Sequence, residues 1–301
     1  EARWGIVDGN DKRAGNDEAI TLRTYANNES DWILERISSE ELRDAQGNRI
    51  ALRRSYYDGA AFEGLPLGAI ERGDLRRVES WIEGDRFADE FRAEHDRDGN
   101  VTVSIDGKGS QSELTYDPSH QFLVREVRHV DAATTLTWNA RYDALFGVVT
   151  WFQEPNGHET RATYDALGRV TSIIKPGDSR ERPTLSFEYT VAVPLSTVTT
   201  RARERSGTDE TLDKVVLVDG FGRSRATFSE DAQAGNWIMS GYSSLDARGN
   251  AMFAAYPAEV TALSLPSSTA AALAGTVTLH DALGRVTTLR HPDNTEARTE
   301  Y

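Results

Sequence analysis

The tract YDALGRVT at residues 164–171 is one of three related copies in this 301-residue chain. The copy that begins 22 residues earlier, at residues 142–150, reads YDALFGVVT, and the copy at residues 281–287 reads DALGRVT. Turn-forming residues follow each copy: PNG at 155–157, PG at 176–177 and PDN at 292–294. The recurrence of such a unit indicates an architecture in which one small structural element is repeated along the chain.

Each copy has the chemistry of a turn followed by a strand. Asp165 and Gly168 stand three residues apart, which suits a tight turn because aspartate bonds its own backbone and glycine adopts a positive φ. The Arg-Val-Thr that follows favours an extended strand whose side chains alternate between two faces. Such a hairpin must pair with its neighbours to bury its apolar face. The sequence therefore predicts an all-β fold, a curved strip of successive antiparallel β-hairpins with few short helices.

These copies resemble the tyrosine–aspartate (YD) repeats of Rhs proteins, in which Tyr-Asp is followed by Gly-Arg, a β-favouring pair and a Pro-containing turn. Degenerate copies read DGFGR at 219–223, DARGN at 246–250, YD at 116–117 and DRDGN at 96–100. Phe146 stands where the first copy should have its glycine. The resemblance implies a structural role for Tyr142, Asp143, Tyr164, Asp165, Gly168, Arg169, Asp219, Gly222, Arg223, Asp281, Gly284 and Arg285.

Within these repeats the arginines and tyrosines have distinct expected roles. Arg169, Arg223 and Arg285 follow the turn glycine, and we expect them to reach carboxylates of neighbouring hairpins or carbonyls left open at turns. Tyr142 and Tyr164 combine a large apolar ring with one polar tip, which suits stacking between adjacent layers.

A second resemblance lies upstream. Residues 56–59 read YYDG, residues 64–68 read GLPLG and residues 75–81 read LRRVESW, a pattern similar to the middle region of the B components of Tc insecticidal toxin complexes and of SpvB-type proteins. It implies a Tc-like β-rich region over residues 1–90 and a YD-repeat strip over residues 91–301, within one continuous fragment of a larger shell. In the second region we expect an exposed loop from Arg201 to Asp213 and short helices within 258–275.

Composition excludes several classes of function. A net charge of −14 argues against nucleic acid and anionic membranes as partners, because both require clustered Lys and Arg. The acidic residues are dispersed, which favours a role in solubility over an acidic lumen for a basic cargo. The chain has no cysteine, which excludes disulfides and a cysteine nucleophile. No apolar run of membrane-spanning length is present, so we expect no membrane insertion by this segment.

No motif indicates a cofactor or a catalytic centre, and we expect no enzymatic activity. The six histidines have no metal-ligand spacing, and no nucleophile elbow or phosphate loop is found. The acidic stretch from Asp8 to Asp17 could bind calcium but lacks EF-hand spacing, so it is expected to be a loop. A hydrolase would need two carboxylates across a cleft, and the sequence nominates no pair among its 48 acidic residues.

By resemblance, then, the chain is a non-catalytic segment of an Rhs/Tc-type β-shell that encloses and delivers a C-terminal toxin polypeptide. Its partners would be the rest of its own shell, the toxin cargo and a translocation subunit, and it would be secreted or exported. The chain shows no signal-peptide pattern, and both of its ends look cut. Two alternatives remain: a hydrolase, or an extracellular adhesion or carbohydrate-binding module. The module predicts exposed aromatics on one face, and the candidates are Trp81, Trp138, Trp151 and Trp237.

Overall fold

The computed structural model describes residues 2–3, 19–131, 133–231, 235–265 and 273–301. Every regular element in these ranges is a β-strand, and each strand pairing is antiparallel. The expected all-β fold of successive hairpins is therefore confirmed. The expected Asp8–Asp17 loop lies outside the described residues. The described part of the chain contains no helix able to cross a membrane.

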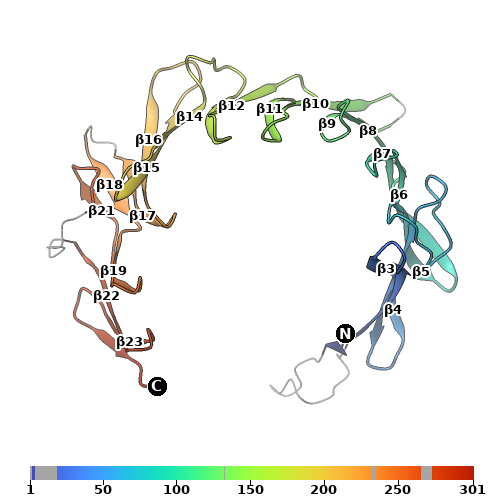
Figure 1. Cartoon of the computed structure of the whole chain (residues 1–301), viewed down its shortest axis with the longest axis horizontal. Coiled ribbons are helices and arrows are strands. Elements are labelled where there is room, and N and C mark those ends of the chain that lie inside the picture. Colours follow the sequence, from blue (N-terminus) through green and yellow to red (C-terminus); the bar gives the residue numbers. More distant parts are fainter. Residues whose placement is uncertain (1, 4–18, 132, 232–234, 266–272) are drawn as a thin grey trace. The chain divides into compact units, whose positions relative to one another are not determined.

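The chain divides into two compact units, Glu1–Gly157 and His158–Tyr301. The boundary that we expected near residue 90 lies inside a strand of the first unit. The strands of unit 1 (Figure 1) are β1 (Ala2–Arg3), β2 (Ala19–Asn28), β3 (Ile33–Asp44), β4 (Arg49–Tyr57), β5 (Leu75–Glu83), β6 (Arg86–His95), β7 (Val101–Asp106), β8 (Gln111–Tyr116), β9 (Leu123–His129), β10 (Thr135–Asp143) and β11 (Val148–Gln153).

In unit 1 each strand from β2 to β10 pairs with the next strand in the sequence, and β1 adds to β2. The loop of residues 58–74 joins β4 to β5, and its Ile70 packs with Tyr57 and Ala26 in a small buried cluster. A Cβ on Gly64 would lie 2.7 Å from Cβ of Tyr56. The glycine-rich GLPLG segment is therefore a closely packed loop, because only glycine lets the backbone approach β4 so closely.

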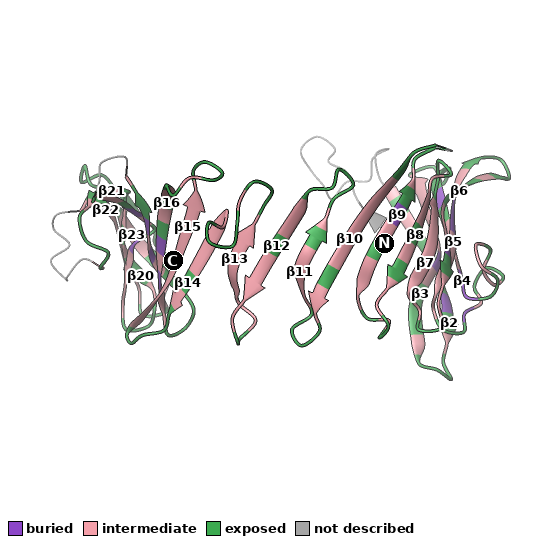
Figure 2. Cartoon of the chain, turned by 90° about the horizontal axis from the view of Figure 1, so that it is seen from above, coloured by how far each residue is buried: buried purple, intermediate pink, exposed green. Residues whose placement is uncertain are grey.

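The strands of unit 2 are β12 (Glu159–Tyr164), β13 (Val170–Ile174), β14 (Leu185–Thr190), β15 (Leu195–Arg203), β16 (Thr211–Asp219), β17 (Ser224–Glu230), β18 (Trp237–Ser240), β19 (Ser243–Leu245), β20 (Ala251–Ala255), β21 (Ala258–Val260), β22 (Gly275–His280), β23 (Val286–Arg290) and β24 (Glu296–Arg298). In Figure 2 the connections between strands are largely exposed, whereas most strand residues have intermediate burial.

Unit 2 departs from a single continuous strip. Strands β12 to β18 pair in sequence order, but β18 then pairs with β21 and not with β19. Strands β19, β20, β22, β23 and β24 therefore form a separate five-stranded sheet. A buried core of Phe228, Met239 and Tyr242 packs against Phe253 and Ala255 of that second sheet.

One expectation about unit 2 was wrong, and a second concerns a segment that is only partly described. Arg201 to Asp213 is not one exposed loop: β15 and β16 extend into it, and Arg201 lies opposite Asp213 with 3.3 Å between Nε and Oδ2. The charged side chains of Arg201 and Asp213, which suggested an exposed loop, form an ion pair across the β15–β16 ladder. At 258–275, residues 258–260 form strand β21 instead of a helix, because β18 offers an unpaired edge. Residues 266–272 of that segment lie outside the described ranges.

Candidate functional site: the aspartate turns

The repeat motif forms a turn organised by its aspartate. Oδ1 of Asp165 accepts the backbone N–H groups of Leu167 at 2.9 Å and Arg169 at 3.0 Å. The Asp165 N–H donates to the Arg169 carbonyl, and the Gly168 N–H donates to the Asp165 carbonyl. Gly168 has a φ of 75°, a conformation that glycine adopts without steric penalty. One carboxylate thus satisfies the donors that a tight turn exposes.

The same hydrogen-bond frame recurs in seven turns of the described chain. In each one, Oδ1 of the aspartate accepts N–H groups two and four residues on, and the glycine three residues on donates to the aspartate carbonyl. These turns are 44–48, 96–100, 106–110, 165–169, 219–223, 246–250 and 281–285. Sequence reasoning did not connect 44–48 and 106–110 to the repeat, although their Asp-x-x-Gly spacing carries the signal.

The first copy of the repeat has one extra residue in its turn. The Asp143 carbonyl accepts the N–H of Gly147, four residues on, at 2.8 Å. Gly147 has a φ of 67°. Phe146 therefore does not replace the turn glycine; it displaces that glycine by one position.

The turn arginines bond the aspartate of their own turn. Nε of Arg169, Arg223 and Arg285 lies 2.7, 2.8 and 2.7 Å from Oδ2 of the aspartate four residues earlier. We expected them to reach carboxylates of neighbouring hairpins or carbonyls left open at turns. Each instead bonds the carboxylate of its own turn, because the fifth residue faces the aspartate across the turn. Asn48, Asn100 and Asn250 occupy the same position and donate Nδ2–H to the same oxygen.

These contacts fix the charge of the aspartates. At Asp165 and Asp219, desolvation works to raise the pKa, but the backbone N–H and guanidinium bonds from Arg169 and Arg223 outweigh it and the net shift is downward. At Asp281 the backbone bond from Arg285 is the largest cause of a lowered pKa. The turn carboxylates are therefore ionised hydrogen-bond acceptors at neutral pH, which makes them unsuited to act as general acids.

Consecutive turns also pack on one another. A Cβ on Gly249 would lie 3.2 Å from Nη1 of Arg223, the last residue of the preceding aspartate turn. Arg248 donates to the Ala282 carbonyl of the next turn. In unit 1, Asn100 donates Nδ2–H at 2.9 Å to the carbonyl of His120, in the turn of residues 117–122. The glycine is thus required at some turns for both its φ and the close approach of a neighbour.

Aromatic rings add to the stacking. The ring of Tyr142 stacks on Phe122 with centroids 4.8 Å apart and planes at 20°. The structural role expected of Tyr142 in the repeat stays a prediction. The Arg169 guanidinium lies 4.4 Å from the ring centroid of Tyr189, and Arg285 lies 4.3 Å from that of Tyr301. Tyr164 is half-buried, and its stacking role stays a prediction.

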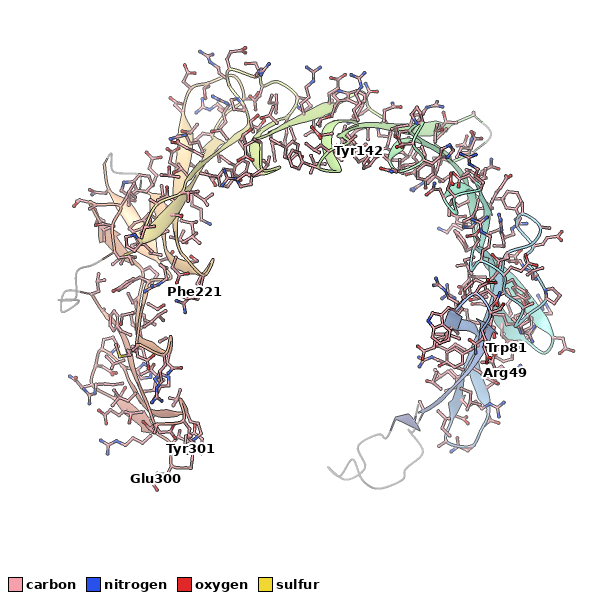
Figure 3. The ribbon with its side chains drawn as sticks, in the orientation of Figure 1. Arg49, Trp81, Tyr142, Phe221, Glu300 and Tyr301 are labelled. Atoms are coloured by element: carbon pink, nitrogen blue, oxygen red, sulfur yellow. The ribbon has the colours of Figure 1, made fainter. Side chains whose placement is uncertain are left out.

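Arginines cover three of the tryptophans that an adhesion surface would need. Arg49 lies over Trp81 from the neighbouring strand (Figure 3), and Arg128 and Arg141 lie over Trp138 and Trp151. Trp151 is opposite Arg141 in the β10–β11 ladder, so Trp138, three residues before Arg141 on β10, points to the other face. Trp237 packs at the edge of the core of unit 2. The four rings do not form one exposed cluster.

One cluster of metal-type ligands links two turns of unit 1. Nδ1 of His120 lies 3.1 Å from Oδ2 of Asp96 and 3.5 Å from Oδ2 of Asp98. Both oxygens of Asp96 also accept hydrogen bonds, from the backbone of residues 98 and 100 and from the Asn100 amide. Hydrogen bonding by His120 is the largest cause of the lowered pKa of Asp96. We assign these residues a structural role. Sequence spacing could not reveal the cluster because its members come from separate turns.

Comparisons with known proteins bear on the fold. No known family pattern matches the sequence, and no curated protein matches it. Solved structures do match: the TcdB2-TccC3 complex without its hypervariable C-terminal region (TM-score 0.68, 12% identity), TcdB2-TccC3-Cdc42 (0.69, 12%) and a mutant Tc holotoxin pore of Photorhabdus luminescens (0.70, 12%). Each match covers 94% of this chain and 22% of the solved chain.

The chain has the fold of a part of TcdB2-TccC3. The resemblance seen in the YD motifs thus holds at the level of the fold. It spans about a fifth of the TcdB2-TccC3 chain, so it concerns one stretch of that protein.

Proposed function

We propose that this chain is a non-catalytic wall segment of an Rhs/Tc-type β-shell, which encloses a toxin polypeptide and delivers it. The observation that carries the proposal is the fold shared with TcdB2-TccC3 over 94% of the chain. Its partners would be the rest of its own shell, the enclosed polypeptide and a translocation subunit. Such a protein acts outside the cell that makes it, so we propose that it is exported.

The pairing of the strands supports a role as a wall. From β2 to β10 in unit 1, each strand pairs with the next in sequence order, so these strands have partners on both edges. Pairing satisfies the backbone groups that an open edge would expose. A sheet that grows by one hairpin at a time covers area without a thick core, and the few buried residues of unit 1 agree with this. Such a sheet is suited to enclosing something.

The carboxylates support the absence of catalysis. Glycoside hydrolysis uses a carboxylic acid with a raised pKa beside an ionised partner. In the described ranges, every aspartate or glutamate with a resolved shift has a lowered pKa, as at Asp58, Asp178 and Glu296, because hydrogen bonds hold the ionised form. These groups act as acceptors that hold loops, which is a structural role.

The adhesion alternative is less well supported. Carbohydrate recognition by aromatic stacking requires open ring faces, whereas Arg49, Arg128 and Arg141 cover the candidate tryptophans. Trp138 and Trp151 also point to opposite faces of their sheet, so they cannot present one platform.

The experiment uses the complete natural polypeptide that carries this chain. Electron cryo-microscopy should show density for an enclosed polypeptide against one face of the strip, and that polypeptide should resist a protease. The double variant Asp165→Ala/Asp219→Ala, which opens two turns, should accelerate its cleavage, whereas Lys108→Ala, on an exposed turn tip, should not. A strip with both faces open to solvent, or an enclosed segment cleaved equally fast in all three proteins, would refute containment.

A further inference from the structure

One rim of the first sheet of unit 2 carries exposed apolar side chains at its turns. The turns after β12, β14 and β16 lie at the same end of the strands, because successive turns of an antiparallel sheet alternate between its two ends (Figure 2). Leu167, Val191, Val193 and Phe221 lie on these turns and are 71%, 79%, 97% and 87% exposed. Turns two strands apart are about 10 Å from one another. These four side chains therefore follow one end of the strands, and we name them the apolar rim.

The turn itself does not require these apolar residues. Leu167 and Phe221 occupy the third position of the aspartate turn, and the Arg223 guanidinium lies 5.1 Å from the Phe221 ring centroid. Gln46, Lys108 and Arg248 occupy the same position in turns with the same hydrogen bonds. Polar residues are therefore compatible with the turn, and they would be favoured at so exposed a site. An apolar patch of this kind on a folded protein indicates a surface that is covered by a partner.

The rim is also locally neutral, although the chain has a net charge of −14. Asp165 pairs with Arg169 and Asp219 with Arg223 inside their own turns. The turn of residues 191–194, between them, carries no charged side chain. Two identical acidic chains would repel over much of their surfaces, but they can approach along this rim with little repulsion.

We propose that the apolar rim is an interaction surface for a second copy of this chain. A two-fold axis places the same patch on both partners, and an apolar neutral row is complementary to itself. Burial of most of these four side chains on both partners would remove on the order of 1,000 Å² from solvent, the lower end of specific interfaces. The inference concerns the surface of unit 2 and is independent of containment.

Sedimentation equilibrium of this chain tests the inference. The wild type should show a concentration-dependent shift from its 33.3 kDa mass to twice that value. The variant Leu167→Gln/Phe221→Lys copies residues found in other aspartate turns and removes only the contact of the Arg223 guanidinium with the Phe221 ring from the fold. Its melting temperature should therefore change little, while the dimer dissociation constant rises about tenfold or more. The matched control Leu212→Gln removes an exposed leucine (55% exposed) at the far end of β16 and should leave the dimer intact.

Three results would overturn the inference. A wild type that stays monomeric at its solubility limit excludes a second copy as the partner. A dimer that the rim variant does not weaken places the contact elsewhere. A monomeric chain whose rim is covered by another segment of the complete polypeptide, as seen in the electron cryo-microscopy map, assigns the rim to that segment.

Discussion

Arg169 donates from Nε to Oδ2 of Asp165 across 2.7 Å, and the two residues are the last and first positions of one turn. The same pairing closes the turns at 219–223 and 281–285. The arginine is therefore part of the turn, and it connects that turn to the sheet through its stacking on Tyr189. This geometry fixes the glycine at the fourth position of the turn but leaves the second and third positions free, so the turn tips can vary.

Loss of the Arg169 guanidinium should weaken unit 2. We expect Arg169→Ala to lower the melting temperature by about 2–4 °C, because the change removes both the bond to Asp165 and the stacking on Tyr189. Arg161→Ala is the control, since that side chain is 63% exposed and pairs with Glu159 on the same strand. Differential scanning calorimetry should show a change of no more than about 1 °C in the melting temperature of the control, because an exposed ion pair contributes little to stability. Equal midpoints for both variants would remove the role given to Arg169.

Two turn glycines separate backbone strain from close packing. Gly47 has a φ of 82° and no atom within 4 Å of an added Cβ, whereas Gly249 has a φ of 88° and Arg223 at 3.2 Å. Gly47→Ala should cost about 1 kcal/mol of unfolding free energy, the penalty of an L-residue in the left-handed region. Gly249→Ala should cost more, because the Arg223 guanidinium must also shift. Urea unfolding measures both; a larger loss at Gly47 would contradict the proposed stacking of turns.

The sequence predicted the turns and strands because the information for them is local. Asp165 and Gly168 specify a turn by their own backbone preferences, and the Val-Thr pairs that follow favour strands. The turn at 106–110 was not recognised as a repeat because it lacks the flanking Tyr and Arg, although Asp106 makes the same bonds.

Features that depend on partners distant in the sequence were not predicted. The sequence predicts a charged loop that contains Arg201 and Asp213, but in the structure the two form an ion pair across the β15–β16 ladder. The contact between His120 and Asp96 joins two turns 24 residues apart, and the division of unit 2 into two sheets depends on which strand takes the edge of β18. Spacing within a motif carries none of this information.

Asp58 should make the stability of unit 1 depend on pH. Its carboxylate is 3% exposed and accepts backbone N–H groups from residues 71 to 74. Burial works to raise its pKa, but these four donors outweigh burial and the net shift is downward. A carboxyl with a lower pKa in the folded than in the unfolded chain stabilises the fold fully above about pH 4, and this contribution is lost as the pH falls through the folded value.

The variant Asp58→Asn tests this directly. Asparagine keeps the shape but replaces one acceptor oxygen with an N–H₂ group that faces backbone donors, so we expect a loss of about 2–3 kcal/mol at pH 7. The loss should shrink between pH 4 and pH 2, where the wild type loses the same charge. Urea midpoints at several pH values give the result. A constant difference from pH 7 to pH 2 would show that the charge of Asp58 does not carry the effect.

His120 should control the ionisation of Asp96, because its ring is the first cause of the lowered pKa of that carboxyl. His120 has a φ of 57°, so the variant must tolerate the left-handed region, and His120→Asn does so better than most residues. We expect the pKa of Asp96 to rise toward its usual value in this variant, as followed by the carboxyl carbon in an NMR titration. Asp246, in a turn with the same frame but no histidine bond, should titrate as in the wild type. If Asp96 titrates unchanged while Asp246 does too, the backbone and Asn100 bonds of its own turn hold the charge, and the contact between the two turns contributes nothing to it.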